Sequence, residues 1–413
     1  MNHRTSRMHV SFVLSGLVCL LPATLKADDL VVGMSAAFTG PSKGLGIELY
    51  RGSMAYFDDI NSRGGVHGRK IVIKAYDDGY NPISAIENSI QLIEKDDVFL
   101  LFNYVGTPTT TRCLPLLKRH SDKSVMLFCP FSGAEPQRQR PYGEFAFNLR
   151  ASYYQETAGL VDHFVEIGRK RVAVFYQIDA YGRNGWEGVR LGLARYGLKM
   201  AGEATYRRGT THKESMERQV EILRKTDADA VISIGSYAAC AAFIREARDA
   251  GWDVPIANVS FVGSESLLEL LQETGKEKGI DYTKDLINSQ VVPSYHDLKL
   301  PVVREYRQLM DRTPAMPPSG LLKEAYQPLR YSFVSLEGFL NAKLLVAVLN
   351  KMGPPFERKR LKEVAESLAD LDLGMDMLLS FGQDRHQASD RVYYTVVQGG
   401  RFEPLTDWKR WRK

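Results

Sequence analysis

Short apolar runs alternate with longer amphipathic stretches from residue 30 onward, and this alternation restricts the possible folds more than any other feature. The first run is Leu30–Ala37, and residues 46–62 then place Ile47, Tyr50 and Phe57 at helical spacing. Strand and helix repeats of this length are typical of a parallel sheet covered by helices on both faces. The sequence therefore predicts an α/β protein.

The alternation occurs in two successive parts of the chain. In the first part we expect strands at 30–37, 70–76, 98–103 and 125–129, and helices at 46–62, 83–95 and 108–119. In the second part we expect strands at 170–176, 230–235 and 255–262, and helices at 153–167, 183–197, 214–225 and 238–250. Two such units favour a ligand cleft between them, because ligands of open parallel sheets bind beyond the carboxyl ends of the strands.

The remainder of the chain gives three further expectations. Residues 319–351 are predicted to form one long helix or two, and 391–398 with 401–405 a terminal hairpin. The basic and aromatic segment Trp408–Lys413 is expected to be a solvated end.

Length and charge set broad limits. A chain of 413 residues implies two or three domains, and 44% hydrophobic with 25% charged residues excludes a disordered chain. The formal net charge of +5 is too small for this length to indicate a nucleic-acid partner.

The first 27 residues have the three-part pattern of a secretory signal peptide. Arg4 and Arg7 precede an apolar run at 10–21, and the segment ends on the small residue Ala27. A retained membrane anchor is the alternative, and a lipid-modified Cys19 is disfavoured because Val18 stands where that signal needs a small residue. We expect a periplasmic protein.

Three cysteines follow the leader: Cys113, Cys129 and Cys240. Their odd number permits at most one disulfide, and Cys113 with Cys129 is the pair close in sequence. Two interpretations stay open: a disulfide between Cys113 and Cys129, or three cysteines that are simply small buried side chains.

Catalytic and metal motifs are absent from the sequence. It contains no phosphate loop, H-E-x-x-H or C-x-x-C, and its histidines are scattered. The pair Asp77 and Asp78 could hold a cation or act as acid and base, although such pairs more often cap the next helix and loop. We expect no enzyme activity, no metal and no cofactor.

Small and hydroxyl residues instead follow four of the predicted strands. In the first part these are Val105–Thr110 and Pro130–Ala134, and in the second Asp179–Gly182 and Gly235–Tyr237. Unsatisfied backbone N–H groups at helix starts suit an anionic ligand group. The pattern favours a polar cleft with aromatic walls.

The ordered motifs resemble a known family, the type I periplasmic binding proteins. The residues that carry the resemblance are Gly33-Met-Ser…Gly40, Asp59–Arg69, Tyr76-Asp-Asp78…Pro82, Gly106–Thr109, Pro130–Ala134, Asp179–Gly182 and Ser260–Gly263. The similarity runs from about 30 to 402 and is greatest to the leucine/isoleucine/valine-binding group that serves ABC importers.

The resemblance implies two Rossmann-like lobes with parallel sheets, joined by three hinge crossings near 148–151, 290–293 and 378–381. After a signal peptide at 1–27, lobe one would comprise 28–150 plus 292–378, and lobe two 151–291 plus 379–413. The lobes would close on a small ligand by hinge motion.

The resemblance also implies ligand-binding positions. Amino-acid-binding members hold the ligand carboxylate at two junctions of lobe one, and the matching residues here are Gly106 and Thr107, then Ser132, Gly133 and Ala134. Aromatic residues of lobe two cover the ligand, and their matches are Tyr181 and Tyr237. Tyr153 could reach the cleft or pack in the hinge.

Two departures from the family pattern concern the ligand and a disulfide. Ser260 stands where amino-acid-binding members carry an acid, with Glu265 about one helical turn beyond. Because a buried ammonium without a partner is costly, either Glu265 or another acid reaches in, or the ligand is not a simple amino acid. The two positions of the family's lobe-one disulfide align with Tyr80 and Val105.

The function expected from the resemblance is that of the periplasmic solute-binding component of an ABC importer. Its ligand would be an amino acid, an amide or another small carboxylate, and its partner a permease. The alternative is a ligand-sensing subunit for a membrane signalling protein. We expect a monomer without a nucleic-acid partner.

Overall fold

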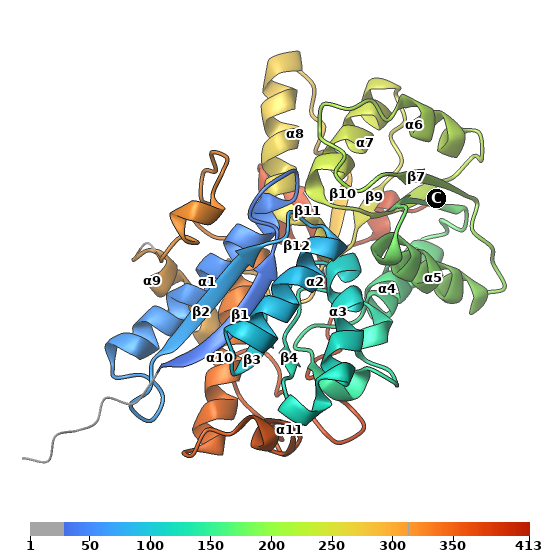
Figure 1. Cartoon of the computed structure of the whole chain (residues 1–413). Helices are drawn as coiled ribbons and strands as arrows, with labels where there is room; N and C mark the ends of the chain where they lie inside the picture. Colours follow the sequence, from blue (N-terminus) through green and yellow to red (C-terminus); the bar gives the residue numbers. More distant parts are fainter. Residues whose placement is uncertain (1–28, 313) are drawn as a thin grey trace, which may run out of the picture.

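The computed structural model describes residues 29–312 and 314–413, so the predicted signal peptide lies outside the described residues. Two sheets, each covered by helices, make up the fold (Figure 1). This confirms the predicted α/β class.

The first sheet is parallel throughout, in the order β2-β1-β3-β4-β5. Its strands are β1 (Leu30–Ala36), β2 (Ile71–Asp77), β3 (Leu100–Phe102), β4 (Leu127–Phe128) and β5 (Ala146–Phe147). Its helices from the first part of the chain are α1 (Lys43–Ser62), α2 (Pro82–Ile90) and α3 (Thr107–Arg119).

The second sheet has the order β12-β11-β10-β9-β8-β6-β7, and its strand pairs are parallel except those of β11, which runs antiparallel to both β10 and β12. Its strands are β6 (Val172–Gln177), β7 (Gly202–Tyr206), β8 (Ala230–Ile234), β9 (Ile256–Asn258), β10 (Leu286–Gln290), β11 (Tyr393–Gln398) and β12 (Arg401–Pro404). Its helices are α4 (Tyr153–Glu166), α5 (Ala180–Ala194), α6 (Glu217–Arg224), α7 (Tyr237–Asp249) and α8 (Ser264–Lys278).

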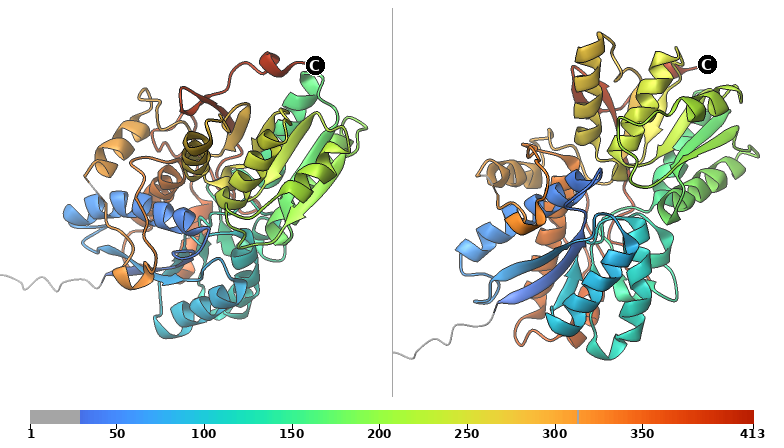
Figure 2. Two further views of the ribbon diagram at one scale, coloured as in Figure 1. Left: turned by 90° about the horizontal axis from the view of Figure 1, so that it is seen from above. Right: turned by 45° about the horizontal axis from the view of Figure 1, so that its top comes forward.

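Three later helices return to the first sheet. They are α9 (Pro301–Met310), α10 (Phe333–Met352) and α11 (Arg358–Glu366), and α10 packs along α1 (Figure 2). The two helices approach closely at Gly52, where a Cβ atom would lie 1.8 Å from the carbonyl oxygen of Ser335. Of the described helices, α10 is long and apolar enough to cross a membrane, but 83% of its apolar window is buried inside the fold, as in a core helix.

The chain passes between the two sheets three times: after β5, after β10 and between α11 and β11. The first and third passages run side by side, because Asn148 pairs with Gln387. His386, the residue before Gln387 in the third passage, stacks on Phe147 of the first sheet, with ring centroids 4.0 Å apart. The lobe boundaries at 150/151, 291/292 and 378/379 stay predictions.

The expectation of helix throughout 319–351 is wrong for its first part. Only a 3-10 turn at Ser319–Leu321 forms, and α10 begins at Phe333 after a cap by Ser332, whose hydroxyl accepts a hydrogen bond from the Ser335 amide. Pro328 lies between the two, and proline disfavours helix at its own position and at the residue before it.

The expectation of a solvated C-terminal end is also wrong. Trp408 is 7% exposed and stacks on His163 of α4, with ring centroids 4.4 Å apart. The last amide, of Lys413, donates a 3.0 Å hydrogen bond to the carbonyl of Ile167. The aromatic residues of this segment bury apolar surface that a frayed end would leave in water.

The three cysteines in the described part of the chain are free and buried, so the Cys113–Cys129 disulfide does not form. Burial raises the pKa of Cys113 to about 12. The cysteines are three small buried side chains.

Candidate functional site

The site begins at the carboxyl ends of β3 and β4, where two turns of the first sheet lie side by side. Val105 forms a bridge with Phe131, and the amide of Gly106 donates to the carbonyl of Phe131 at 3.1 Å. Gly106 has φ 98°, and a Cβ atom there would lie 2.1 Å from the ring of Tyr80. Only glycine fits this position, because it combines a left-handed backbone with an aromatic ring in contact.

A pair of buried hydroxyls links the two turns. The Oγ1 atom of Thr107, the first residue of α3, lies 2.8 Å from Oγ of Ser132 and 3.4 Å from the hydroxyl of Tyr153. Ser132 Oγ also accepts a hydrogen bond from the Ala134 amide, and the Tyr153 amide donates to the Gly133 carbonyl at 2.7 Å. The structure thus places the six predicted residues Gly106, Thr107, Ser132, Gly133, Ala134 and Tyr153 next to one another.

Four buried rings form the aromatic cluster of Phe131, Tyr153, Tyr181 and Phe261, and the hydroxyl of Tyr153 joins this cluster to the hydroxyl pair. Ring centroids are 5.2 Å apart for Tyr153 and Tyr181, 4.6 Å for Tyr181 and Phe261, and 5.3 Å for Phe261 and Phe131. Phe131 follows β4 of the first sheet, whereas Tyr181 and Phe261 follow β6 and β9 of the second. The cluster therefore spans the junction between the first sheet with its helices and the second sheet with its helices, which we call the two halves of the molecule.

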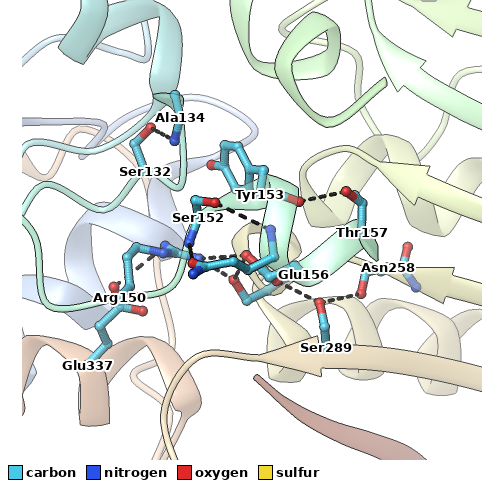
Figure 3. Close-up of polar contacts among 12 residues, drawn as sticks. Ser132, Ala134, Arg150, Ser152, Tyr153, Glu156, Thr157, Asn258, Ser289 and Glu337 are labelled. Atoms are coloured by element: carbon cyan, nitrogen blue, oxygen red, sulfur yellow. Dashed lines mark hydrogen bonds and ion pairs between the residues drawn. The ribbon is translucent and has the colours of Figure 1, made fainter. Parts of the chain in front are cut away.

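A buried cation closes the aromatic cluster. The guanidinium carbon of Arg150 lies 4.8 Å from the ring centroid of Phe131 and 5.8 Å from that of Tyr153, in cation–π contact. Figure 3 shows Arg150 between Glu156 of α4 and Glu337 of α10, each with a carboxylate oxygen 3.5 Å from a guanidinium nitrogen. We call these three residues the Arg150 cluster.

The charges of the Arg150 cluster influence one another. Burial raises the pKa of Glu337 to about 7, although Arg150 opposes the shift. Burial alone would lower the pKa of Arg150, but Glu337 and Glu156 reverse the effect and raise it. The guanidinium therefore stays charged, while Glu337 titrates near neutral pH.

Ser260, which stands where an acid was expected from the family, is itself bound to one. Its amide and hydroxyl donate to the Glu156 carboxylate at 2.8 and 3.0 Å, and Ser289 donates to the same carboxylate at 2.6 Å. Arg150 also donates to the Ser260 hydroxyl. The acid in this place comes from the first turn of α4.

Two predicted residues, Tyr237 and Glu265, lie elsewhere along the junction. The Tyr237 hydroxyl accepts a 3.1 Å hydrogen bond from the Gly44 amide at the start of α1. Glu265, on α8, accepts from the Phe333 amide at 3.3 Å, and burial raises its pKa to about 8. No contact described for either residue joins it to the aromatic cluster.

Five residues of the site were not predicted from the sequence: Phe131, Arg150, Glu156, Phe261 and Glu337. Phe131 and Phe261 lie inside the quoted motifs, where an aromatic residue next to a cleft serine was the available signal. Arg150 lies in the first predicted crossing and Glu156 in the first turn of α4. Neither of these two gave a signal, because both acquire their roles from partners that are distant in sequence.

The carboxylates of Asp77 and Asp78 cap backbone amides of the loops around them, whereas Asn81 caps α2. The Asp77 carboxylate accepts from the amides of Phe38 and Gly79 at 2.8 and 3.0 Å, and Asp78 accepts from the Tyr80 amide at 2.8 Å. Residues 29–312 and 314–413 contain no group of three or more metal-binding side chains.

Comparisons with known proteins agree with this architecture. A family model described as Periplasmic binding protein matches residues 29–401. The "Leu/Ile/Val-binding protein homolog 7" of Brucella abortus (strain 2308) is 24% identical over 406 residues, covering 92% of this chain and 93% of the relative. The "Amino acid binding protein" of Pseudomonas aeruginosa is 25% identical over 225 residues, and the match spans 54% of this chain and only 58% of that relative.

A solved structure extends the similarity to three dimensions. It is described as a possible leucine/isoleucine/valine-binding protein from Rhodopirellula baltica SH 1, and it matches with a TM-score of 0.82 at 30% identity. The match covers 95% of this chain and all of the other. The family and these relatives are binding proteins, which agrees with the expectation that the chain is not an enzyme. The chain belongs to the periplasmic binding protein family.

Proposed function

We propose that the protein is the periplasmic solute-binding component of an ABC importer and captures a small polar ligand between its two halves. The observation that carries this proposal is the aromatic cluster, which receives side chains from both sheets and contacts the hydroxyl pair of the first sheet. The names of the relatives specify amino-acid binding, and this supports a ligand as small as an amino acid.

In this proposal Thr107 and Ser132 supply hydroxyls to a ligand carboxylate, and the amides of Gly106, Gly133 and Ala134 supply further donors. The hydroxyls and amides would hold the ligand on the first sheet, and Tyr153 and Tyr181 would cover it from the second. The other predicted ligand-binding residues would contact the ligand only if the lobes were arranged differently; they are Tyr237, Ser260 and Glu265.

Hinge motion would give the ligand access. The described contacts pack the four rings and Arg150 against one another, so the ligand must enter before the halves approach this closely. The three passages between the sheets are the segments about which the halves would rotate.

The test is to identify the ligand and then its route. Mass spectrometry of the protein purified from the periplasm should detect one small molecule that is released on denaturation. Deletion of the coding sequence should then abolish high-affinity uptake of that molecule. Absence of any bound molecule would contradict the capture of a solute, and a bound molecule whose uptake is unchanged by the deletion would contradict the importer role.

A sensing subunit is the second candidate, because it needs the same site and differs only in its partner. Deletion in that case would leave uptake unchanged and remove the response of a membrane kinase or cyclase to the same molecule.

A further inference from the structure

The Arg150 cluster contains the feature of the site that best discriminates between kinds of ligand. Arg150 is 1% exposed, and its Nε and Nη1 atoms have no hydrogen-bond acceptor among the described residues, although Nη1 lies 3.5 Å from a Glu337 oxygen. A buried guanidinium with unused donors is a costly arrangement unless an acceptor arrives with a ligand.

Two carboxylates near the aromatic cluster, those of Glu156 and Asp179, are by contrast already occupied, whereas Glu337 faces Arg150 at 3.5 Å and Glu265, away from the cluster, has one buried oxygen without a hydrogen-bond partner among the described residues. One oxygen of Glu156 accepts from the Ser260 amide and from Ser289, and the other accepts from the Ser260 hydroxyl and faces Arg150. Asp179 accepts from the Tyr181 amide through one oxygen and from Gln177 and Arg208 through the other. Neither acid has an oxygen left for a ligand ammonium.

Arg150 lies beside Ser260, the position at which the family resemblance led us to expect an acid that pairs with a ligand ammonium. It donates to Ser260, contacts Glu156 and rests on the faces of Phe131 and Tyr153, so the protein provides its own cation there. A second cation from the ligand would be buried beside Arg150 without a partner, which is strongly unfavourable.

We propose that the ligand is a small carboxylate with an apolar body and without an ammonium group, and that Arg150 selects it. This inference rests on the proposed solute-binding function and names its ligand class. The carboxylate would accept hydrogen bonds from the unused donors of Arg150 and from Thr107 and Ser132, and the aromatic cluster would cover the apolar body.

The test compares probes that differ only in their charged groups. One series is 3-phenylpropanoate, L-phenylalanine and 2-phenylethylamine, and the other is 4-methylpentanoate, L-leucine and 3-methylbutylamine. Calorimetry on the mature protein, freed of co-purifying solute, should show binding of at least one carboxylate. The matched amino acid should bind about 100-fold more weakly, and the amine should show no binding at about 1 mM.

Variants test the role of Arg150. Arg150→Gln alone would leave Glu156 buried without its cation, so the main variant is Arg150→Gln combined with Glu156→Gln. It should lose at least about tenfold in carboxylate affinity and reduce the preference over the amino acid. The control is Arg248→Gln, which removes a buried arginine of α7 whose two Nη atoms bind the carbonyls of Trp252, Val254 and Lys284 and whose Nε has no acceptor among the described residues.

The outcomes separate this inference from the proposed function. If an amino acid binds as tightly as its matched carboxylate, or a co-purifying solute carries an ammonium, the ligand class is wrong and solute binding stands. Unchanged carboxylate affinity in the double variant rejects selection by Arg150. If none of the six probes binds, the inference fails, and the proposed function is then judged by the co-purifying solute alone.

Discussion

The side-chain amide of Gln177 donates a 3.3 Å hydrogen bond to the hydroxyl of Tyr80, and this contact joins the two halves of the molecule. Gln177 is the last residue of β6, and Tyr80 lies in the loop between β2 and α2 with its ring against Gly106. The same Gln177 nitrogen also donates to Asp179 at 2.7 Å. Loss of the Tyr80 hydroxyl therefore removes the bridge without leaving Gln177 unpaired.

Tyr80→Phe should shift the ligand-free protein toward a more open arrangement. A hydrogen bond contributes about 1 kcal/mol net, which is a severalfold change in a two-state equilibrium. Small-angle scattering should report a larger radius of gyration than for the wild type. Tyr76→Phe is the control, because the Tyr76 hydroxyl bonds Asp96 within the first half. Identical scattering from both variants would show that the Tyr80 bridge does not hold the halves together.

Thr107→Val should weaken binding of the solute found by mass spectrometry by about tenfold, since hydrogen bonds to a charged group contribute about 1.5–3 kcal/mol. The change keeps the β-branched shape, so thermal unfolding should move little. Thr111→Val, on the same helix, removes a hydroxyl that bonds the Thr107 carbonyl, and its affinity should equal that of the wild type. Equal loss in both variants would place the effect in the helix rather than in the site.

Gly106→Ala should destabilise the protein by about 2 kcal/mol, because the new methyl group meets the Tyr80 ring at a left-handed backbone position. Chemical denaturation measures the change. Gly320→Ala is the matched control, since nothing lies within 4 Å of the position that its Cβ atom would take. A Gly106 variant as stable as the control would mean that the Tyr80 ring is free to move away.

Glu265 should make the protein less stable as the pH rises. Its pKa is raised by burial to about 8, above the ordinary value of 4.5, so the folded state holds the proton more tightly than the unfolded state. Stability is then fully present below about pH 4.5 and declines as the pH rises toward about 8.

Glu265→Gln, which mimics the protonated acid, should flatten that decline. Relative to the wild type it should gain about 2 kcal/mol or more between pH 5 and pH 9, as followed by urea unfolding. The control is Glu273→Gln on an exposed turn of α8. Parallel stability curves for the wild type and the Glu265 variant would reject the raised pKa.

The cysteines should be unreactive in the folded protein. Burial raises the pKa of Cys113 and of Cys240 to about 12, and thiolate is the reactive form. Titration with a chromogenic disulfide reagent should therefore detect the thiols of the mature chain only after denaturation, and a reductant should leave the melting temperature unchanged. Rapid reaction of a native thiol would contradict the buried placement.

Local patterns were sufficient to predict most of the fold. Buried parallel strands are continuous apolar runs, so β1, β6 and β8 stand out in the sequence. The two-residue strand β5 and the half-exposed β7 lack such a run. The end of the chain was misjudged because its packing depends on His163, which is remote in sequence.

The site was predictable only in part, for the same reason. Gly106, Thr107 and Ser132 follow predicted strands, and the carboxyl ends of neighbouring parallel strands must meet. Arg150 and Glu337 gave no such signal, because their meeting depends on how α10 returns to the first sheet.

The docking of the C-terminus on α4 affects how this protein can be labelled. Trp408 covers His163 of α4, the helix that starts with Tyr153 in the aromatic cluster, and Trp411 is only 4% exposed. A purification tag fused directly after Lys413 would be attached to a segment that packs on α4, not to a solvated end. A spectroscopic use follows from the same arrangement: Trp408, Trp411 and the other two tryptophans, Trp186 and Trp252, all lie with the second sheet, so indole emission reports on that half of the molecule without any added fluorophore.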